Sequence, residues 1–195
     1  MTRPMKRRAL ATFLLGSAFT LPSAAQTVRD TSYQDTAGSR VLRMEVDAPV
    51  SVKEAWRLWT TSDGLRSWMA PVIDVELRVG GKWEASYDPQ KKIGDEGNIH
   101  NEILSYVPYR MVSMRVAKFP DDYPLDQEKV RKTHTVVLFE ELDEDRTRVI
   151  VCGVGYGDGP DWDAIYRVGV QSTRYSLELF HKRCVTPETP VEPGR

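Results

Sequence analysis

From Arg40 to Val154, apolar and polar residues alternate within short segments that are separated by turn-forming residues. Residues 72–79 show the pattern most clearly, since Val75, Leu77 and Val79 share one side of the segment. A period of two is typical of a β-strand with one buried face. The pattern predicts about seven antiparallel strands, at residues 40–46, 72–79, 82–87, 99–107, 111–116, 133–142 and 147–154.

Two short helices are predicted between the first and second of these strands. Ser51 is suited to cap a helix start, and Glu54 stands three residues later, in the position that completes a capping box. The helix that follows places Ala55 and Trp59 on one side, and a second short helix continues to Trp68. Both helices therefore precede the main run of strands.

The segment Pro160 to Cys184 is predicted to be one helix, for which Asp161 supplies the N-terminal cap. At about 1.5 Å per residue it is longer than a domain of ~30 Å is wide, so it must cross the whole protein. One face has bulky ends and a small middle, in the order Trp162, Tyr166, Gly169, Thr173, Leu177 and Phe180. Glycine inside a helix costs about 1 kcal/mol against alanine. Gly169 either lets the helix backbone pack closely on a neighbour or leaves room beneath it, and we favour the second explanation.

Strands that follow one another without intervening long helices indicate an α+β protein rather than a parallel α/β fold. A sheet of seven strands needs cover on one face, and the C-terminal helix is long enough to supply it. We expect one domain at residues 40–185, preceded by a flexible leader at residues 26–39 and followed by a disordered tail at residues 186–195.

Residues 1–25 have the layout of a cleavable signal peptide. A basic start that includes Arg7 and Arg8 precedes an apolar run from Ala9 to Leu21, and small residues follow up to Ala25. The run is shorter than the ~20 residues that span a bilayer, which favours a signal peptide over an uncleaved membrane anchor. We expect cleavage after Ala25 and a soluble periplasmic or secreted domain, exported by the general or the twin-arginine route.

The charge balance argues against polyanionic partners. The whole chain has a net charge of −1, and without residues 1–25 its 23 basic and 28 acidic residues give −5. A protein with no basic excess has no electrostatic attraction for nucleic acid or for an anionic membrane surface. We therefore expect neither a nucleic-acid partner nor stable membrane insertion once the signal is removed.

The chain has two cysteines, Cys152 and Cys184. In an oxidising compartment they are able to form a disulfide between the last strand and the end of the long helix. The alternative, which we favour, is two separate buried thiols that behave as small apolar side chains.

The histidines His100, His134 and His181 lie in three different predicted elements, without the spacing of a metal-binding motif. No metal site and no cofactor are therefore predicted. His100 and Glu102 share one face of a strand, which is one arrangement for an acid/base pair. A solvated strand face is the preferred explanation of the same spacing.

Five tryptophans are many for a chain of 195 residues. Each ring is suited to fill the core, and a group of them is also suited to line an apolar ligand cavity. The residues predicted to bind a ligand between sheet and helix are Trp59, Trp68, Trp83, Tyr87, Met114, Tyr166, Gly169 and Thr173.

The stretch APVSVKEAWRLWTTSDGLRSWMAP, which begins at Ala48, and the later VELRVGG resemble the SRPBCC, or START-like, superfamily. Within it they are most similar to the branch named for activators of the heat-shock-90 ATPase, through Ala48-Pro49, Trp56, Trp68, Pro71 and Gly80-Gly81. The resemblance implies a helix-grip fold, in which a curved antiparallel sheet surrounds a C-terminal helix and encloses a cavity. It also implies relatives that carry lipids, cyclise polyketides or bind hormones.

Three functions follow as hypotheses. The preferred one is an exported protein, more plausibly not an enzyme, that binds a small apolar or amphipathic molecule in the cavity. The second is a cyclase- or hydrolase-type enzyme, which requires His100, Glu102 or His134 to point into the cavity. The third is a protein-interaction module of the chaperone-activator type, since one fold hosts many activities.

Overall fold

The computed structural model describes residues 27–120 and 123–186, which form nine strands and four helices. The strands are β1 (Arg29–Asp30), β2 (Tyr33–Gln34), β3 (Arg40–Ala48), β4 (Val72–Val75), β5 (Lys82–Ser86), β6 (Ile99–Val107), β7 (Met111–Lys118), β8 (His134–Asp143) and β9 (Arg146–Val154). The helices are α1 (Val52–Thr60), α2 (Ser62–Arg66), α3 (Gln127–Val130) and α4 (Pro160–Val185).

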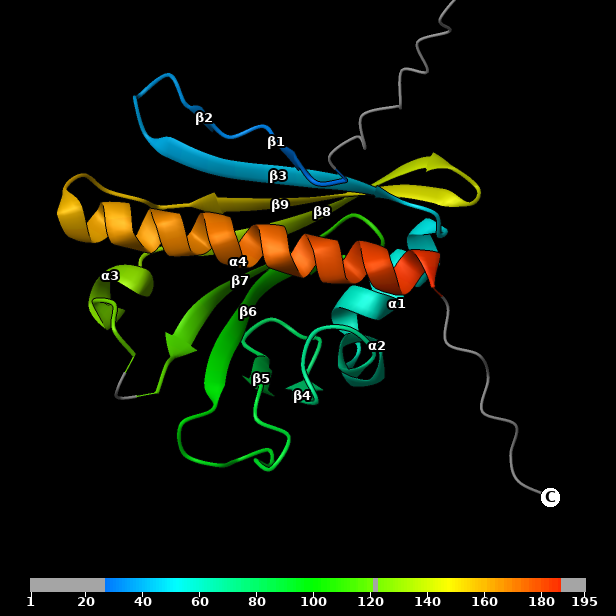
Figure 1. Ribbon diagram of the computed structural model, residues 1–195, viewed down its shortest axis with the longest axis horizontal. Helices are drawn as coiled ribbons and strands as arrows, with labels where there is room; N and C mark the ends of the chain where they lie inside the picture. The colour runs from blue at the N-terminus through cyan, green and yellow to red at the C-terminus, as the bar shows by residue number, and fades with distance from the viewer. Residues whose placement is uncertain (1–26, 121–122, 187–195) are drawn as a thin grey trace, which may run out of the picture.

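The strands form one antiparallel sheet in the order β1-β3-β9-β8-β7-β6-β5-β4, and β2 pairs with β3 beside β1. Strands β3 to β9 correspond to the seven that the alternating pattern predicts. The predicted strand at residues 72–79 is shorter than expected, since β4 ends at Val75 and Val79 is 66% exposed. Helix α4 crosses one face of the sheet along β3 and β9, while β6, β5 and β4 curve away from it (Figure 1). The α+β class and the helix-grip architecture are thus confirmed.

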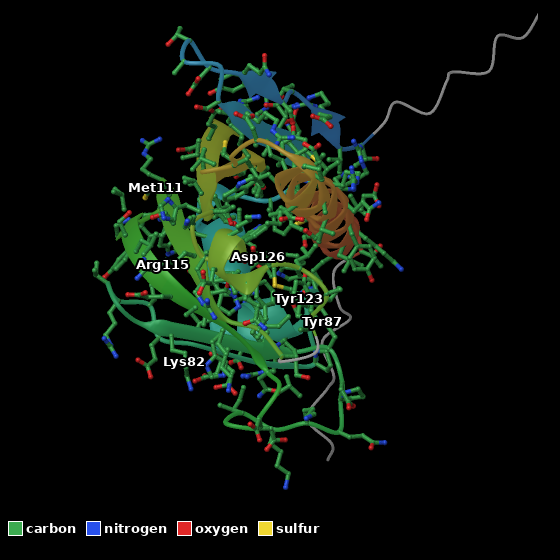
Figure 2. All side chains as sticks on the ribbon, turned by 90° about the vertical axis from the view of Figure 1, so that its left-hand side faces the viewer. Lys82, Tyr87, Met111, Arg115, Tyr123 and Asp126 are labelled. Carbon is green, nitrogen blue, oxygen red and sulfur yellow. The ribbon has the colours of Figure 1, made fainter. Side chains whose placement is uncertain are left out.

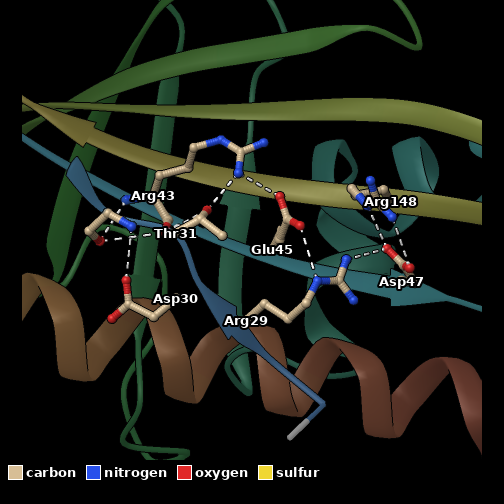
Figure 3. Close-up of polar contacts among 8 residues, drawn as sticks. Arg29, Asp30, Thr31, Arg43, Glu45, Asp47 and Arg148 are labelled. Atoms are coloured by element: carbon tan, nitrogen blue, oxygen red, sulfur yellow. Dashed lines mark hydrogen bonds and ion pairs between the residues drawn. The ribbon is translucent and has the colours of Figure 1, made fainter. Parts of the chain in front are cut away.

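The segment predicted to be a flexible leader differs from that expectation, because it forms β1 and β2 against β3. Val28 is buried, and Arg174 of α4 donates a hydrogen bond to its carbonyl at 3.4 Å. Arg29 binds Glu45 at 3.1 Å and Asp47 at 2.9 Å, on the face of β3 that points away from α4 (Figure 3). Side-chain contacts with β3 and α4 therefore fix strands that are too short and too polar to show a period.

Asp47 is the centre of this polar network. Arg148 of β9 donates two hydrogen bonds to its carboxylate, at 2.7 and 3.1 Å, and Arg29 donates the third contact (Figure 3). The hydrogen bonds from Arg148, with those from Arg29, outweigh partial burial and lower the pKa of Asp47 to about 2. The network joins β1 to β3 and β9 across the outer face of the sheet.

Helix α1 starts as predicted, with the Ser51 hydroxyl accepting a hydrogen bond from the Glu54 amide at 3.3 Å. The apolar side of α1 packs on the C-terminal half of α4. Phe180 lies 5.6 Å from the Trp59 ring and 5.5 Å from the Trp68 ring, and the two indoles are 4.8 Å apart. This aromatic group closes one end of the space between sheet and helix.

The start of α4 differs in detail from the prediction. The capping position is Gly159, with a φ of 102° in the left-handed region, and Pro160 opens the first turn. Asp161, predicted to be the cap, lies inside that turn and pairs with Lys129 of α3. Asp163 pairs with Arg40 of β3 at 2.7 Å. The two acidic residues therefore tie the helix start to its neighbours, which also suits the positive end of the helix dipole.

Both cysteines are free thiols in the structure, and the disulfide considered above is not formed. Cys152 of β9 lies opposite Arg43 of β3 in the strand register, and its side chain is on the sheet face that points away from α4. On the inner face, the neighbouring residue Leu42 lies beside Gly169. Cys184 is about 15 residues farther along α4, which at 1.5 Å per residue is about 22 Å. The sheet and this distance both separate the two sulfurs.

Candidate functional site: a cavity beneath the C-terminal helix

A cavity of about 500 Å³ lies between the inner face of the sheet and α4. Small-molecule sites in proteins span roughly 300–1,000 Å³, so the volume suits a small ligand. The strands contribute alternate residues, as the pleat requires. The sheet wall includes Trp83 and Ala85 of β5, Asn101 of β6, Met114 of β7, and Thr135 and Val137 of β8.

The helix wall has small side chains in its middle and the larger Ile165 and Val168 nearer the start of α4. Gly169, Ser172, Thr173 and Ser176 of α4 line the cavity, whereas the bulkier Leu177 and Phe180 follow at its closed end. The order of bulky and small residues in the sequence therefore corresponds to a space under the middle of the helix.

The structure places six of the eight predicted ligand-binding residues in the cavity wall. They are Trp59, Trp83, Tyr87, Met114, Gly169 and Thr173. Trp68 and Tyr166 lie behind the wall. The Trp68 indole donates a hydrogen bond to the Leu58 carbonyl at 3.0 Å, which holds its ring on α1. Tyr166 packs edge-on against Tyr156 and carries the Arg40 guanidinium 5.1 Å from its ring centre.

Gly169 itself has a different role from the one predicted. A Cβ atom at this position would lie 2.7 Å from the Tyr156 hydroxyl and 3.4 Å from Leu42. A Cβ at Gly153 of β9 would lie 2.6 Å from the same hydroxyl. The two glycines thus allow the Tyr156 phenol to fit closely between β9 and α4. Gly169 is required for close packing, and the empty space begins beside it.

Tyr156 is a wall residue that the sequence analysis missed, because it lies in the glycine-rich corner before α4. Burial, with a smaller effect from Tyr166, raises the pKa of its hydroxyl to about 12. The phenol therefore stays protonated at neutral pH and is available as a hydrogen-bond donor.

The long connection between β7 and β8 supplies a further part of the wall. Phe119 and Tyr123 stack at 4.1 Å with nearly parallel rings, and both line the cavity. Val130, at the end of α3, packs with Phe119 and with Ile165 of α4 in a second apolar cluster. The connection between β7 and β8 therefore forms one side of the cavity.

Tyrosines gather at the rim of the cavity. Tyr87, which follows β5, is 60% exposed and still lines the cavity. Figure 2 shows it close to Tyr123. Partial burial and the neighbouring phenols of Tyr175 and Tyr123 raise the pKa of Tyr87. Val168 of α4, which is also exposed, lines the cavity as well. The rim therefore combines apolar ring surface with hydroxyl groups.

The polar residues that an enzyme would need face away from the cavity. In the β5–β6 pair, Trp83 is opposite Asn101 on the cavity side, while Glu84 is opposite His100 on the other side. Glu102 is opposite Lys82 on that same outer face. His134 directly precedes Thr135, which lines the cavity, so the pleat turns His134 outward. His100, Glu102 and His134 are therefore not among the residues that line the cavity.

Glu84 is a fully buried carboxylate on this outer face. It accepts hydrogen bonds from Lys82 at 2.7 Å, from the Gly94 amide at 2.6 Å and from the Asn98 side chain at 2.6 Å. Burial alone would raise its pKa, but these hydrogen bonds outweigh burial and lower the pKa to about 2. The contacts with Gly94 and Asn98 anchor the loop that follows Tyr87.

Within residues 27–120 and 123–186, no group of three or more His, Cys, Asp or Glu side chains is placed to hold a metal ion. No helix in the same residues is long and apolar enough to cross a membrane. The buried Nε1–H of Trp59 makes no hydrogen bond within the described part of the chain, which leaves one unsatisfied donor in a wall residue.

A sequence profile of the family described as "Activator of Hsp90 ATPase homolog 1-like protein" matches residues 49–179, more than half of the chain. The chain belongs to this family. Membership is consistent with a module that binds a ligand or another protein, and it does not distinguish between them. No curated protein matches the chain in sequence.

Several solved structures share the fold of this Hsp90-activator-like chain. An Aha1 dimer from Colwellia psychrerythraea superposes with a TM-score of 0.59 at 16% identity, covering 76% of this chain and 98% of that one. An HSP90 activator from Plasmodium falciparum gives 0.54 at 16% identity, with 76% and 99% covered. CalU16 from Micromonospora echinospora gives 0.58 at 14% identity, with 85% and 88% covered. At these identities the likeness establishes the fold alone.

Proposed function

We propose that this Hsp90-activator-like chain is an exported binding protein that holds a small apolar or amphipathic molecule between its sheet and α4. The observation that carries the proposal is the cavity of about 500 Å³ lined by aromatic, aliphatic and hydroxyl side chains. Such a lining, with a few polar groups among apolar ones, is the usual composition of a ligand site. The outward orientation of His100, Glu102 and His134 favours binding over catalysis.

Export is the second part of the proposal. It rests on the basic start, the short apolar run and the small residues that end at Ala25. These residues lie outside the part of the chain that the structure describes. Expression of the full chain in a bacterial host, fractionation and intact-mass measurement test it. A periplasmic or secreted species that begins at Gln26 is expected, and a full-length cytoplasmic species would refute export.

Ligand binding is tested in two steps. Native mass spectrometry of protein purified from its own host should show a co-purifying small molecule. Fluorescence titration with N-phenylnaphthylamine, an uncharged probe that brightens in apolar sites, should then saturate at one probe per chain once the natural ligand is removed.

A cavity-filling pair of variants locates the binding. Ala85→Leu places three extra carbon atoms in the cavity wall and is expected to weaken probe binding at least about 10-fold. Ala117→Leu adds the same atoms at an exposed position of β7, outside the cavity, and is the matched control. Equal probe affinity in the two variants would show that the probe binds elsewhere, and the proposal would then fail.

A protein-interaction role is the second candidate, and family membership favours it. Under this alternative the chain stimulates the ATPase of a heat-shock-90 chaperone, as the description of its family suggests. A steady-state ATPase assay with the chaperone of the same host tests it. A stimulation that Ala85→Leu leaves unchanged would favour interaction, whereas no stimulation together with saturable probe binding would favour the carrier role.

A further inference from the structure

Three hydroxyl groups gather at one place in the cavity wall. The Tyr156 hydroxyl lies between Gly153 and Gly169. Thr135 is the cross-strand partner of Gly153, and opposite residues in an antiparallel pair are about 5 Å apart. Thr173 lies one helical turn beyond Gly169, about 6 Å away on the same side of α4. Tyr156, Thr135 and Thr173, here called the hydroxyl cluster, all line the cavity.

The hydroxyl cluster makes no hydrogen bond to the protein within the described residues, in contrast to other hydroxyls of the same wall. Ser172 donates to the Val168 carbonyl of its own helix at 2.8 Å, and Thr133 donates to the Val130 carbonyl at 2.7 Å. Each of the three residues is partly exposed and lines the cavity, so its hydroxyl is not sealed inside the core. The cluster therefore offers three unpaired hydroxyl groups, each able to donate and to accept a hydrogen bond, to a molecule in the cavity.

The same wall contains no charged side chain among the residues that the structure describes. The positive charge of Arg40 acts on the Tyr156 hydroxyl, where it partly offsets the rise in pKa that burial causes. Its guanidinium is already paired with Asp163 at 2.7 Å and donates to the Gly157 carbonyl at 2.5 Å. It also stacks over Tyr166, behind the wall. Arg40 is thus compensated and outside the cavity.

We propose that the ligand of this cavity is electrically neutral and has an apolar body with a hydroxyl or carbonyl group, which the hydroxyl cluster binds. The apolar body lies against Trp59, Trp83 and Met114. The proposal rests on the proposed binding function and narrows it to one chemical class. It excludes fatty acids, bile-acid-like anions and amines as natural ligands.

The exclusion follows from desolvation. An ion that leaves water for an apolar site without an opposite charge loses several kcal/mol, and hydroxyl donors recover part of that loss. A neutral hydroxyl or carbonyl group gives up far less hydration and receives one or two hydrogen bonds from the cluster. The wall therefore discriminates by charge before it discriminates by shape.

Displacement of N-phenylnaphthylamine by three ten-carbon compounds tests the inference, using the chain from Gln26 onward. Decanol, decanoate and decylammonium share one apolar body and differ in the charge of the head group. At neutral pH, decanol should displace the probe at a concentration at least about 100-fold lower than either ion. Displacement by decanoate or decylammonium at a concentration equal to or below that of decanol would overturn the inference and leave the binding function standing. Failure of the probe to bind at all would instead overturn the binding function, and the inference with it.

Variants then test the hydroxyl cluster. Tyr156→Phe removes an oxygen to which no described protein group is bonded, so the fold should persist. It should raise the decanol concentration needed for displacement about 5-fold, the value of one neutral hydrogen bond. Thr173→Val should act in the same direction. Tyr106→Phe removes a hydroxyl from a core-packed tyrosine of β6 outside the cavity wall, and is the matched control. Decanol binding that is equal in Tyr156→Phe and Tyr106→Phe would remove Tyr156 from the site.

Discussion

The buried carboxylate of Glu84 provides a quantitative test of the structure. Glu84→Gln keeps the size and shape of the side chain and removes its charge. The amides of Gly94 and Asn98 then lose a charged acceptor, and the Lys82 ammonium, which is partly exposed, turns to solvent. We expect a less stable protein with the same fold, because no large group is added or removed.

The magnitude comes from the pKa of Glu84. It falls from 4.5, the ordinary value, to about 2 in the folded protein. Each pKa unit corresponds to about 1.4 kcal/mol, so the ceiling is about 3 kcal/mol. Because Lys82 is partly exposed, solvent screening makes the contribution of Glu84 smaller than this ceiling. We expect Glu84→Gln to lower the free energy of unfolding by about 2 kcal/mol at pH 7. Because the folded pKa is lowered, the stabilisation is complete above about pH 4.5 and is lost as the pH falls towards 2.

Urea denaturation followed by tryptophan fluorescence measures both effects. The stability difference between the wild type and Glu84→Gln should shrink by more than half between pH 7 and pH 3. Glu102→Gln is the matched control on the same sheet face, since Glu102 is partly exposed and pairs with Arg115 at 2.8 Å. It should cost less than about 1 kcal/mol at pH 7. A Glu84→Gln difference that is zero, or that is as large at pH 3 as at pH 7, would refute the reasoning.

Phe180→Ala should lower the free energy of unfolding by about 3–5 kcal/mol in urea denaturation, because the ring is fully buried against the two indoles of Trp59 and Trp68. Gly169→Ala should lower the melting temperature, because the new Cβ would lie too close to the Tyr156 hydroxyl. Combining it with Tyr156→Phe should restore the melting temperature, and a double-mutant cycle without coupling would contradict this contact. Asp47→Asn should cost about 1 kcal/mol at pH 7 after allowance for its exposure, and this difference should disappear in denaturation curves as the pH falls from 5 towards 2.

The alternating pattern was sufficient to predict that β3 to β9 exist, because these strands turn alternate residues towards the core. It did not predict that β4 ends at Val75, or that the outer face of β5 is also covered, where Glu84 is fully buried. It was insufficient for β1 and β2. Both strands are two residues long. Contacts of Arg29 with residues 16 and 18 positions away hold β1, and pairing with β3 holds β2. A periodic signal needs several residues, whereas an ion pair across the sheet depends on the fold already being formed.

The cavity was predictable in outline but not in detail. The small side chains in the middle of one face of α4 indicated where the cavity lies, and most of the predicted wall residues line it. Tyr156 was missed because the glycines around it indicate only a flexible corner, and nothing local shows that its ring inserts between two of them. Trp68 and Tyr166 were predicted to line the cavity, but they lie behind the residues that do. A helix face is broad enough to hold both wall residues and those that support them.

The position of β1 has a consequence for how the chain matures. Only Gln26 and Thr27 separate the proposed cleavage point after Ala25 from the buried Val28. A protease must hold its substrate extended on both sides of the bond that it cuts, so these residues cannot pair with β3 while the peptide is being removed. Removal of the peptide should therefore precede the docking of this edge strand, and the trimmed molecule should resist unfolding and digestion better than its precursor.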